Sequence, residues 1–62
     1  MINNKPFRIN NKQKIVDAAF DLSVKYGFDN VSMKQIQEAA DIGAGSIYYH
    51  FKNKNEILEY YS

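Results

Sequence analysis

The amino-acid sequence predicts an all-α fold: a three-helix helix-turn-helix domain followed by the start of a fourth helix. Apolar residues recur at helical spacing along most of the chain. Three segments open with a capping-box pattern, in which an Asn or Ser is followed three residues later by Gln or Glu. No segment carries a strand signal that rises above the helical one. Because the chain has only 62 residues, it forms one domain at most.

Composition narrows the classes of function. The chain has no cysteine, which excludes disulfides, thiolate metal sites and cysteine nucleophiles, and makes the cytoplasm the expected location. No apolar run approaches the roughly 20 residues that span a bilayer, and the N-terminus lacks the apolar segment of a signal peptide. We therefore expect no membrane partner.

The distribution of charge says more than the net charge of +1. Residues 1–14 carry four basic side chains and no acidic one, whereas residues 15–31 hold three aspartates against Lys25 alone. This distribution fits a domain with one face directed at a polyanion, although a solvated tail explains the charge equally well. Residues 1–9, which contain Pro6, are interpreted as a flexible basic arm.

The first helix is predicted over about residues 11–26. Asn10-x-x-Gln13 has the form of a capping box at its start. Its apolar stripe consists of Ile15, Ala18, Ala19, Leu22 and Tyr26. Gly27 is expected to supply the left-handed residue that ends the helix, with Phe28 packing back on the last turn.

The second helix is predicted over about residues 33–40, after the capping box Ser32-x-x-Gln35. Its buried face is expected to hold Met33, Ile36, Ala39 and Ala40. Asp41 then tolerates the left-handed region that a turn requires, and Ile42 is expected to plug the core between two helices. Gly43 is an acceptable N-cap for the next helix.

The third helix is predicted over about residues 44–50, with Ile47 and Phe51 facing inward and Tyr48 near the boundary of the core. Asn53-x-x-Glu56 is a third capping box and opens the fourth helix. The apolar side of that helix is expected to hold Ile57, Leu58 and Tyr61. Because this pattern is still running at the C-terminus, we expect the chain to end in mid-helix as a fragment.

Two short helices joined by a tight turn form a helix-turn-helix, and this one has features that suit DNA. The front of its second helix, Gly43-Ala44-Gly45-Ser46, carries only small residues, which lets the backbone approach base edges or phosphates closely. The following residues are donors suited to phosphate oxygens, namely Tyr48, Tyr49, His50, Lys52 and Lys54. A helix over residues 44–50 is short enough to lie in a major groove about 12 Å wide.

Three runs of residues carry a resemblance to a known family. They are Ser32-Met33-x-x-Ile36, Ala40-x-Ile42 and Gly45-Ser46-Ile47-Tyr48-Tyr49-His50-Phe51-Lys52-Asn53-Lys54-x-Glu56-Ile57-Leu58. Together they strongly resemble the DNA-binding domain of TetR-family transcriptional regulators. The resemblance extends to the first helix and covers roughly residues 12–60.

The resemblance implies a helix-turn-helix DNA-binding domain over residues 10–52, with the helix over residues 44–50 in the major groove. Residues 53–62 would start a helix leading to an absent C-terminal domain that dimerises and binds a small-molecule effector. Family members are usually repressors that bind palindromic operators as dimers. By position, Ser32, Tyr49, His50 and Lys54 match phosphate contacts, and Lys34, Ala44, Gly45, Ser46 and Tyr48 match base-facing positions. Residues 1–62 alone are expected to be a monomer with weak affinity for DNA.

The chain also departs from the family pattern. Family members often have Ser-Lys where this chain has Gly43-Ala44, so a hydroxyl cap and a basic contact are absent, and Ala44 can offer only apolar contact with a thymine methyl. The family often has an aromatic residue at Ser23 and an Ala at Gln37, which suggests looser packing here. Phe20 is interpreted as a partial compensation for Ser23.

Several alternatives stay open at this point. Tyr48 fits a core position as well as an interface, His50 and Lys54 fit a solvated surface, and a guanine contact is one possibility for Lys34. A second hypothesis is a protein-interaction module, which would dock through exposed Phe20, Val24, Tyr60 and Tyr61. An enzyme is not expected. The single histidine has no second metal ligand or base within helical reach, so we expect no metal or other cofactor.

Overall fold

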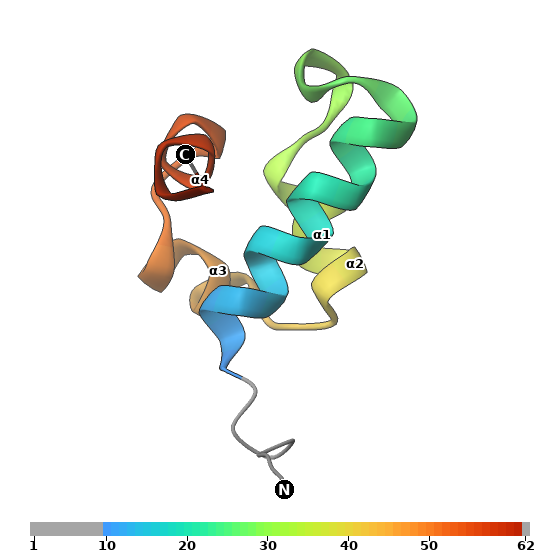
Figure 1. Ribbon diagram of the computed structural model, residues 1–62. Coiled ribbons are helices and arrows are strands. Elements are labelled where there is room, and N and C mark those ends of the chain that lie inside the picture. The colour runs from blue at the N-terminus through green and yellow to red at the C-terminus, as the bar shows by residue number, and fades with distance from the viewer. Residues whose placement is uncertain (1–9, 62) are drawn as a thin grey trace, which may run out of the picture.

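The computed structural model describes residues 10–61, and the side chain of Tyr61 is outside the described set. The elements are α1 (Asn11–Tyr26), the 3₁₀ helix η2 (Phe28–Asn30), α2 (Met33–Ala40), α3 (Ala44–His50) and α4 (Lys54–Tyr61) (Figure 1). No strand occurs in this part of the chain. The all-α prediction is confirmed. The predicted basic arm at residues 1–9 lies outside the described residues.

Helix α1 is the central element, because it packs against η2, α2, α3 and α4 (Figure 1). The innermost core consists of Ile15, Ile36 and Ile47, which are fully buried and come from α1, α2 and α3 respectively. Fully burying one such side chain contributes about 1.5–3 kcal/mol. The three isoleucines therefore fix the mutual positions of the three helices of the helix-turn-helix unit.

The predicted stripe on α1 needs two corrections. Tyr26 is 54% exposed, so the stripe ends one turn earlier, at the partly buried Leu22. Val16 is buried although it lies off the stripe. Its burial follows from α4, because Ile57 lines the same pocket and covers a second face of α1. A helix packed on two faces buries more than one stripe.

At each end of α1 a side chain forms a hydrogen bond with the backbone of the helix. The backbone N–H of Gln13 donates to Asn10 Oδ1 at 2.7 Å. The predicted capping box is only half formed, since the Gln13 side chain donates to Asp17 Oδ1 instead of turning back to Asn10. At the C-terminal end Gly27 has φ 89°, and the Asn30 side chain donates to the carbonyl of Tyr26 at 2.8 Å.

The capping box at Ser32 is complete: the N–H of Gln35 donates to Ser32 Oγ at 3.1 Å, and the N–H of Ser32 donates to Gln35 Oε1 at 2.7 Å. Of the predicted apolar face of α2, Ala40 is buried but Ala39 is exposed. Val31, just before α2, is buried and was not predicted. Val31 lies outside any helix, so the helical periodicity of the sequence did not indicate its burial.

The turn between α2 and α3 follows the prediction. Asp41 adopts the left-handed conformation, with φ 59° and ψ 51°, and its N–H donates to carbonyls in the last turn of α2. Ile42 packs partly buried against the core. Gly43 is the N-cap of α3 and offers no side-chain cap. This turn sets the direction in which α3 leaves the core.

Helix α4 opens with a variant of the predicted capping box. The N–H of Glu56 donates to Asn53 Oδ1 at 3.0 Å, but Glu56 Oε1 accepts from the N–H of Lys52 at 2.7 Å rather than from that of Asn53. Ile57 is buried as expected, whereas Leu58 is about half exposed. The prediction for Tyr61 lies outside the described side chains.

Candidate nucleic-acid interface

Helix α3 has one face in the core and one face in solvent. Ile47 is fully buried and Phe51, its C-cap, is nearly so, which fixes the rotation of the helix about its axis. On the opposite side Tyr48 is 55% exposed and Tyr49 is 84% exposed. Tyr48 therefore stands on the surface and not in the core, which settles one of the alternatives left open by the sequence.

The front of α3 is open. Gly43, Ala44 and Gly45 are all exposed, and a methyl group placed on either glycine would meet nothing within 4 Å. Neither glycine is therefore required by packing within the domain. The small side chains leave the backbone at the front of α3 accessible to a partner.

Ser46 is held by a residue that the sequence analysis did not single out. Asn11 Nδ2 donates to Ser46 Oγ at 3.1 Å, across a sequence separation of 35 residues. The N-terminal end of α1 consequently lies beside α3 (Figure 1). No local pattern indicates this contact, because it depends on how the two helices pack.

Tyr49 and His50 form an edge-to-face ring pair, with ring centroids 5.1 Å apart and an interplanar angle of 79°. The pair restricts both rings at the C-terminal end of α3. The Tyr49 hydroxyl and the imidazole ring are both capable of hydrogen bonds to phosphate oxygens. The structure thus brings two of the predicted phosphate-binding side chains together.

Ser32 and Lys34 lie at the start of α2 and are exposed. Ser32 uses its N–H and one oxygen lone pair in the capping box, so its hydroxyl hydrogen remains for an outside acceptor. Within the described residues no hydrogen bond or ion pair engages the Lys34 side chain, and none joins either residue to α3. The structure gives these two positions exposure but no direct link to the rest of the predicted site.

Two lysine side chains that the sequence suggested for a basic surface contact residues of the domain itself. Lys54 Nζ donates to the carbonyl of Phe28 at 2.9 Å and lies 4.7 Å from the centroid of the Phe28 ring. Lys12 Nζ lies 4.7 Å from the ring centroid of Tyr60 and 5.6 Å from that of Phe51. A phosphate contact by Lys54 therefore has to use its remaining N–H groups.

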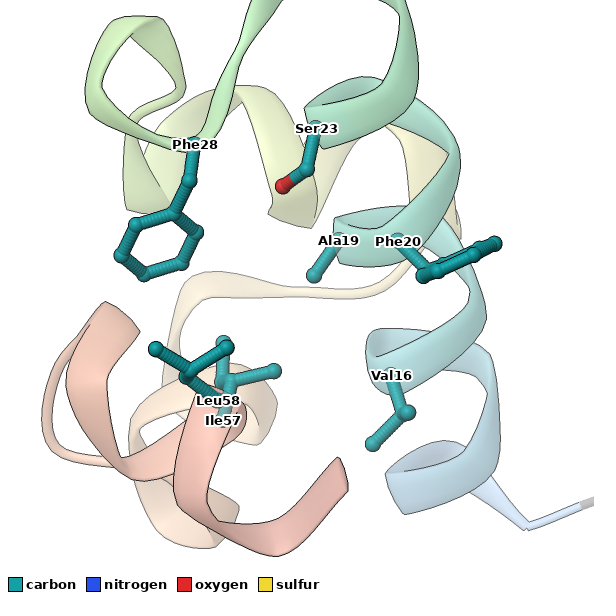
Figure 2. A pocket seen from close by; sticks show the side chains of 7 residues that line it. All are labelled: Val16, Ala19, Phe20, Ser23, Phe28, Ile57 and Leu58. Atoms are coloured by element: carbon teal, nitrogen blue, oxygen red, sulfur yellow. The ribbon is translucent and has the colours of Figure 1, made fainter. Parts of the chain in front are cut away.

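An apolar pocket of about 300 Å³ lies between α1 and α4 (Figure 2). Its lining residues are Val16, Ala19, Phe20, Ser23, Phe28, Ile57 and Leu58. Figure 2 shows the Ser23 side chain directed towards the space beside Phe28. The loose packing suggested by Ser23 corresponds to this pocket. The lining carries no ionisable group.

Within residues 10–61, no group of three or more His, Asp or Glu side chains is placed to hold a metal ion. None of the described helices is long and apolar enough to cross a membrane.

Comparison with known proteins identifies the family of the domain. Residues 15–61 match the family described as bacterial regulatory proteins, tetR family. An HTH-type transcriptional regulator of Staphylococcus aureus (strain bovine RF122 / ET3-1) is 38% identical over 52 residues, which cover 84% of this chain and 28% of that protein. One from strain USA300 is 38% identical over 50 residues, covering 81% of this chain and 27% of that protein.

The chain thus spans little more than a quarter of the length of these relatives. No solved structure matches it significantly. The matched segment contains α1 from Ile15 onwards, α2, the turn, α3 and all of α4. The chain therefore belongs to the tetR family of bacterial regulatory proteins.

Proposed function

We propose that this domain binds double-stranded DNA sequence-specifically, with α3 in the major groove, as part of a transcriptional regulator. The observation that carries the proposal is the two-sided character of α3: Ile47 is locked in the core while Tyr49 on the other side is 84% exposed. A seven-residue helix does not persist alone, so its rigid attachment serves to present that outer face.

The proposed contacts divide into two groups. Contacts with phosphates would come from Ser32, Tyr49, His50 and Lys54, and would position the domain on the duplex. Contacts with base edges would come from Lys34, Ala44, Gly45, Ser46 and Tyr48. Ala44 can add only apolar contact with a thymine methyl, so hydrogen-bonded readout falls to the other side chains and the backbone.

The proposal extends to the whole protein through its family. We infer a repressor that binds a palindromic operator as a homodimer and responds to a small-molecule effector. Dimerisation and effector binding would both belong to a C-terminal domain. Palindromic half-sites about 34–36 Å apart require two copies of α3 at a fixed spacing, which a single domain does not supply. Such a regulator acts in the cytoplasm, where the bacterial chromosome lies.

A salt titration tests the proposal. The full chain is first used to select duplexes from a random-sequence pool, and its affinity for a selected duplex is then measured between about 50 and 200 mM salt. For each phosphate that a basic side chain neutralises, this rise in salt concentration should lower the affinity about three- to fourfold. A steep fall, together with a preference for the selected sequence over unselected DNA, is the expected result. An affinity independent of salt contradicts the proposal.

A second candidate function is protein docking on the pocket side of the domain. The apolar pocket and the exposed Val24 favour it. The two functions are separable, because Val24→Asp should leave selection of duplexes from the pool unchanged and should weaken only an apolar protein contact. If Val24→Asp no longer selected DNA, the DNA contact would lie on the side of Val24 and not on α3, against the proposal.

A further inference from the structure

The contact between Asn11 and Ser46 connects the first residue of α1 to the third residue of α3. Asn11 Nδ2 lies 3.1 Å from Ser46 Oγ. Among residues 10–61 it is the only side-chain to side-chain hydrogen bond that joins two different helices. Its acceptor stands on the front of the helix that is proposed to enter the major groove.

Nothing local requires an asparagine at position 11. The N-terminus of α1 is already capped by Asn10, which accepts the N–H of Gln13. Asn11 is also exposed, so it adds little to the core. The feature that distinguishes its side chain is the bond to Ser46.

That bond defines what the Ser46 hydroxyl can do. A serine hydroxyl has one O–H donor and two acceptor lone pairs, and the Asn11 amide occupies one lone pair. A serine inside a helix often donates its O–H to the carbonyl four residues earlier. No such bond is present for Ser46 within the described part of the chain. Its O–H therefore has no acceptor among the described residues and is available to one outside the domain, and the amide polarises it into a stronger donor.

We propose that Asn11 is a specificity-determining positioning residue, which presets the Ser46 hydroxyl as a hydrogen-bond donor towards DNA bases. The inference rests on the proposed function. A preset donor favours base edges that present acceptors in the major groove, namely guanine N7 and O6, adenine N7 and thymine O4. It disfavours cytosine, which presents its amino group there. Since Gly43, Ala44 and Gly45 carry no donor side chain, Ser46 is the main donor at the front of α3.

The test measures discrimination, not affinity alone. Full-length wild type and Asn11→Ala are compared on the duplex selected by the wild type and on duplexes with single base-pair changes in the half-site. We expect Asn11→Ala to lower the preference for an acceptor-bearing base over cytosine about three- to tenfold at one position. Gln13→Ala is the matched control, because that exposed amide in the same turn bonds only within α1.

Two further variants sharpen the result. Asn11→Asp has only acceptors, so it should draw the Ser46 hydrogen towards itself and reduce the preference more than Asn11→Ala does. In a double-mutant cycle, Asn11→Ala should have no further effect on the preference once Ser46→Ala is present. An equal loss on every duplex, or effects of Asn11 and Ser46 that simply add, would overturn the inference.

The inference and the proposed function fail in different ways. If wild type selects no sequence from the pool, the proposed function fails and the inference fails with it. If wild type selects DNA and Asn11→Ala keeps the wild-type preference, only the inference fails. Circular dichroism of each variant verifies that the helices are intact.

Discussion

The two sides of α1 are packed in different ways. On the side of α2 and α3, three fully buried isoleucines meet, and a complete capping box starts α2. On the side of α4, Ile57 is the only buried residue among residues 54–60 of that helix, and an apolar pocket of about 300 Å³ remains open beside it. This difference in packing indicates that α3 is held in one orientation, whereas α4 is attached less firmly.

Polar contacts compensate on the looser side. Lys12 lies against the rings of Phe51 and Tyr60, and Lys54 lies against the ring and carbonyl of Phe28. Cation–π contacts are worth about 0.5–1 kcal/mol when exposed and about 2 kcal/mol when desolvated. The value for an exposed contact is smaller than the roughly 1.5–3 kcal/mol contributed by burying one isoleucine. Substitutions on the two sides of α1 should therefore lower the stability of the domain by different amounts.

The largest effect is expected for Ile47→Ala on the tightly packed side. Removing a fully buried isoleucine costs about 2–5 kcal/mol, which is most of the stability of so small a domain. The matched variant on the other side, Leu58→Ala, removes a half-exposed side chain and should cost about 1 kcal/mol or less. Urea unfolding measures both. Equal losses in the two variants would remove the distinction between the two sides.

A smaller effect is expected for the caps. Ser32→Ala removes the N-cap of α2 and with it the complete capping box, and should lower stability by about 1 kcal/mol. Asn53→Ala removes one accepted hydrogen bond but leaves the bond between Glu56 and the N–H of Lys52. It should therefore cost less. Thermal unfolding compares the two, and a larger loss for Asn53→Ala would contradict the assignment of α4 to the looser side.

The smallest effect is expected for Lys12→Met. Methionine keeps an apolar stem against the rings of Phe51 and Tyr60 but removes the cation, so stability should fall by about 0.5–1 kcal/mol. Lys34→Met is the control, because Lys34 is exposed and has no ring contact within residues 10–61. If both variants unfold at the same urea concentration, the cation–π contacts do not stabilise the α4 side.

The sequence predicted the helices well because their signals are local. Capping residues such as Ser32 and the left-handed Asp41 depend on a few neighbouring residues, so all four helices lie within the expected bounds. The 3₁₀ helix η2 was missed, since three residues are too few to show a period. The burial of Val16 and the exposure of Ala39 depend on where other helices pack, which periodicity along one helix does not reveal.

The candidate site was predictable in part for the same reason. The exposed outer face of α3 follows from the burial of Ile47, which the sequence indicated. The bond from Asn11 to Ser46 and the bond from Lys54 to Phe28 join residues 35 and 26 positions apart, so no local pattern indicates them. The assignment of individual DNA contacts stays a prediction.

The central claim is that the exposed face of α3 contacts DNA, and Tyr49 tests it most directly. The measurement is the affinity of the full chain for its selected duplex in Tyr49→Ala and in Tyr26→Ala. Tyr26 is the control, because it is also an exposed tyrosine but ends α1. We predict about a tenfold loss for Tyr49→Ala, as expected for a lost charge-assisted hydrogen bond, with affinity unchanged in Tyr26→Ala. Wild-type affinity in a correctly folded Tyr49→Ala would contradict the account.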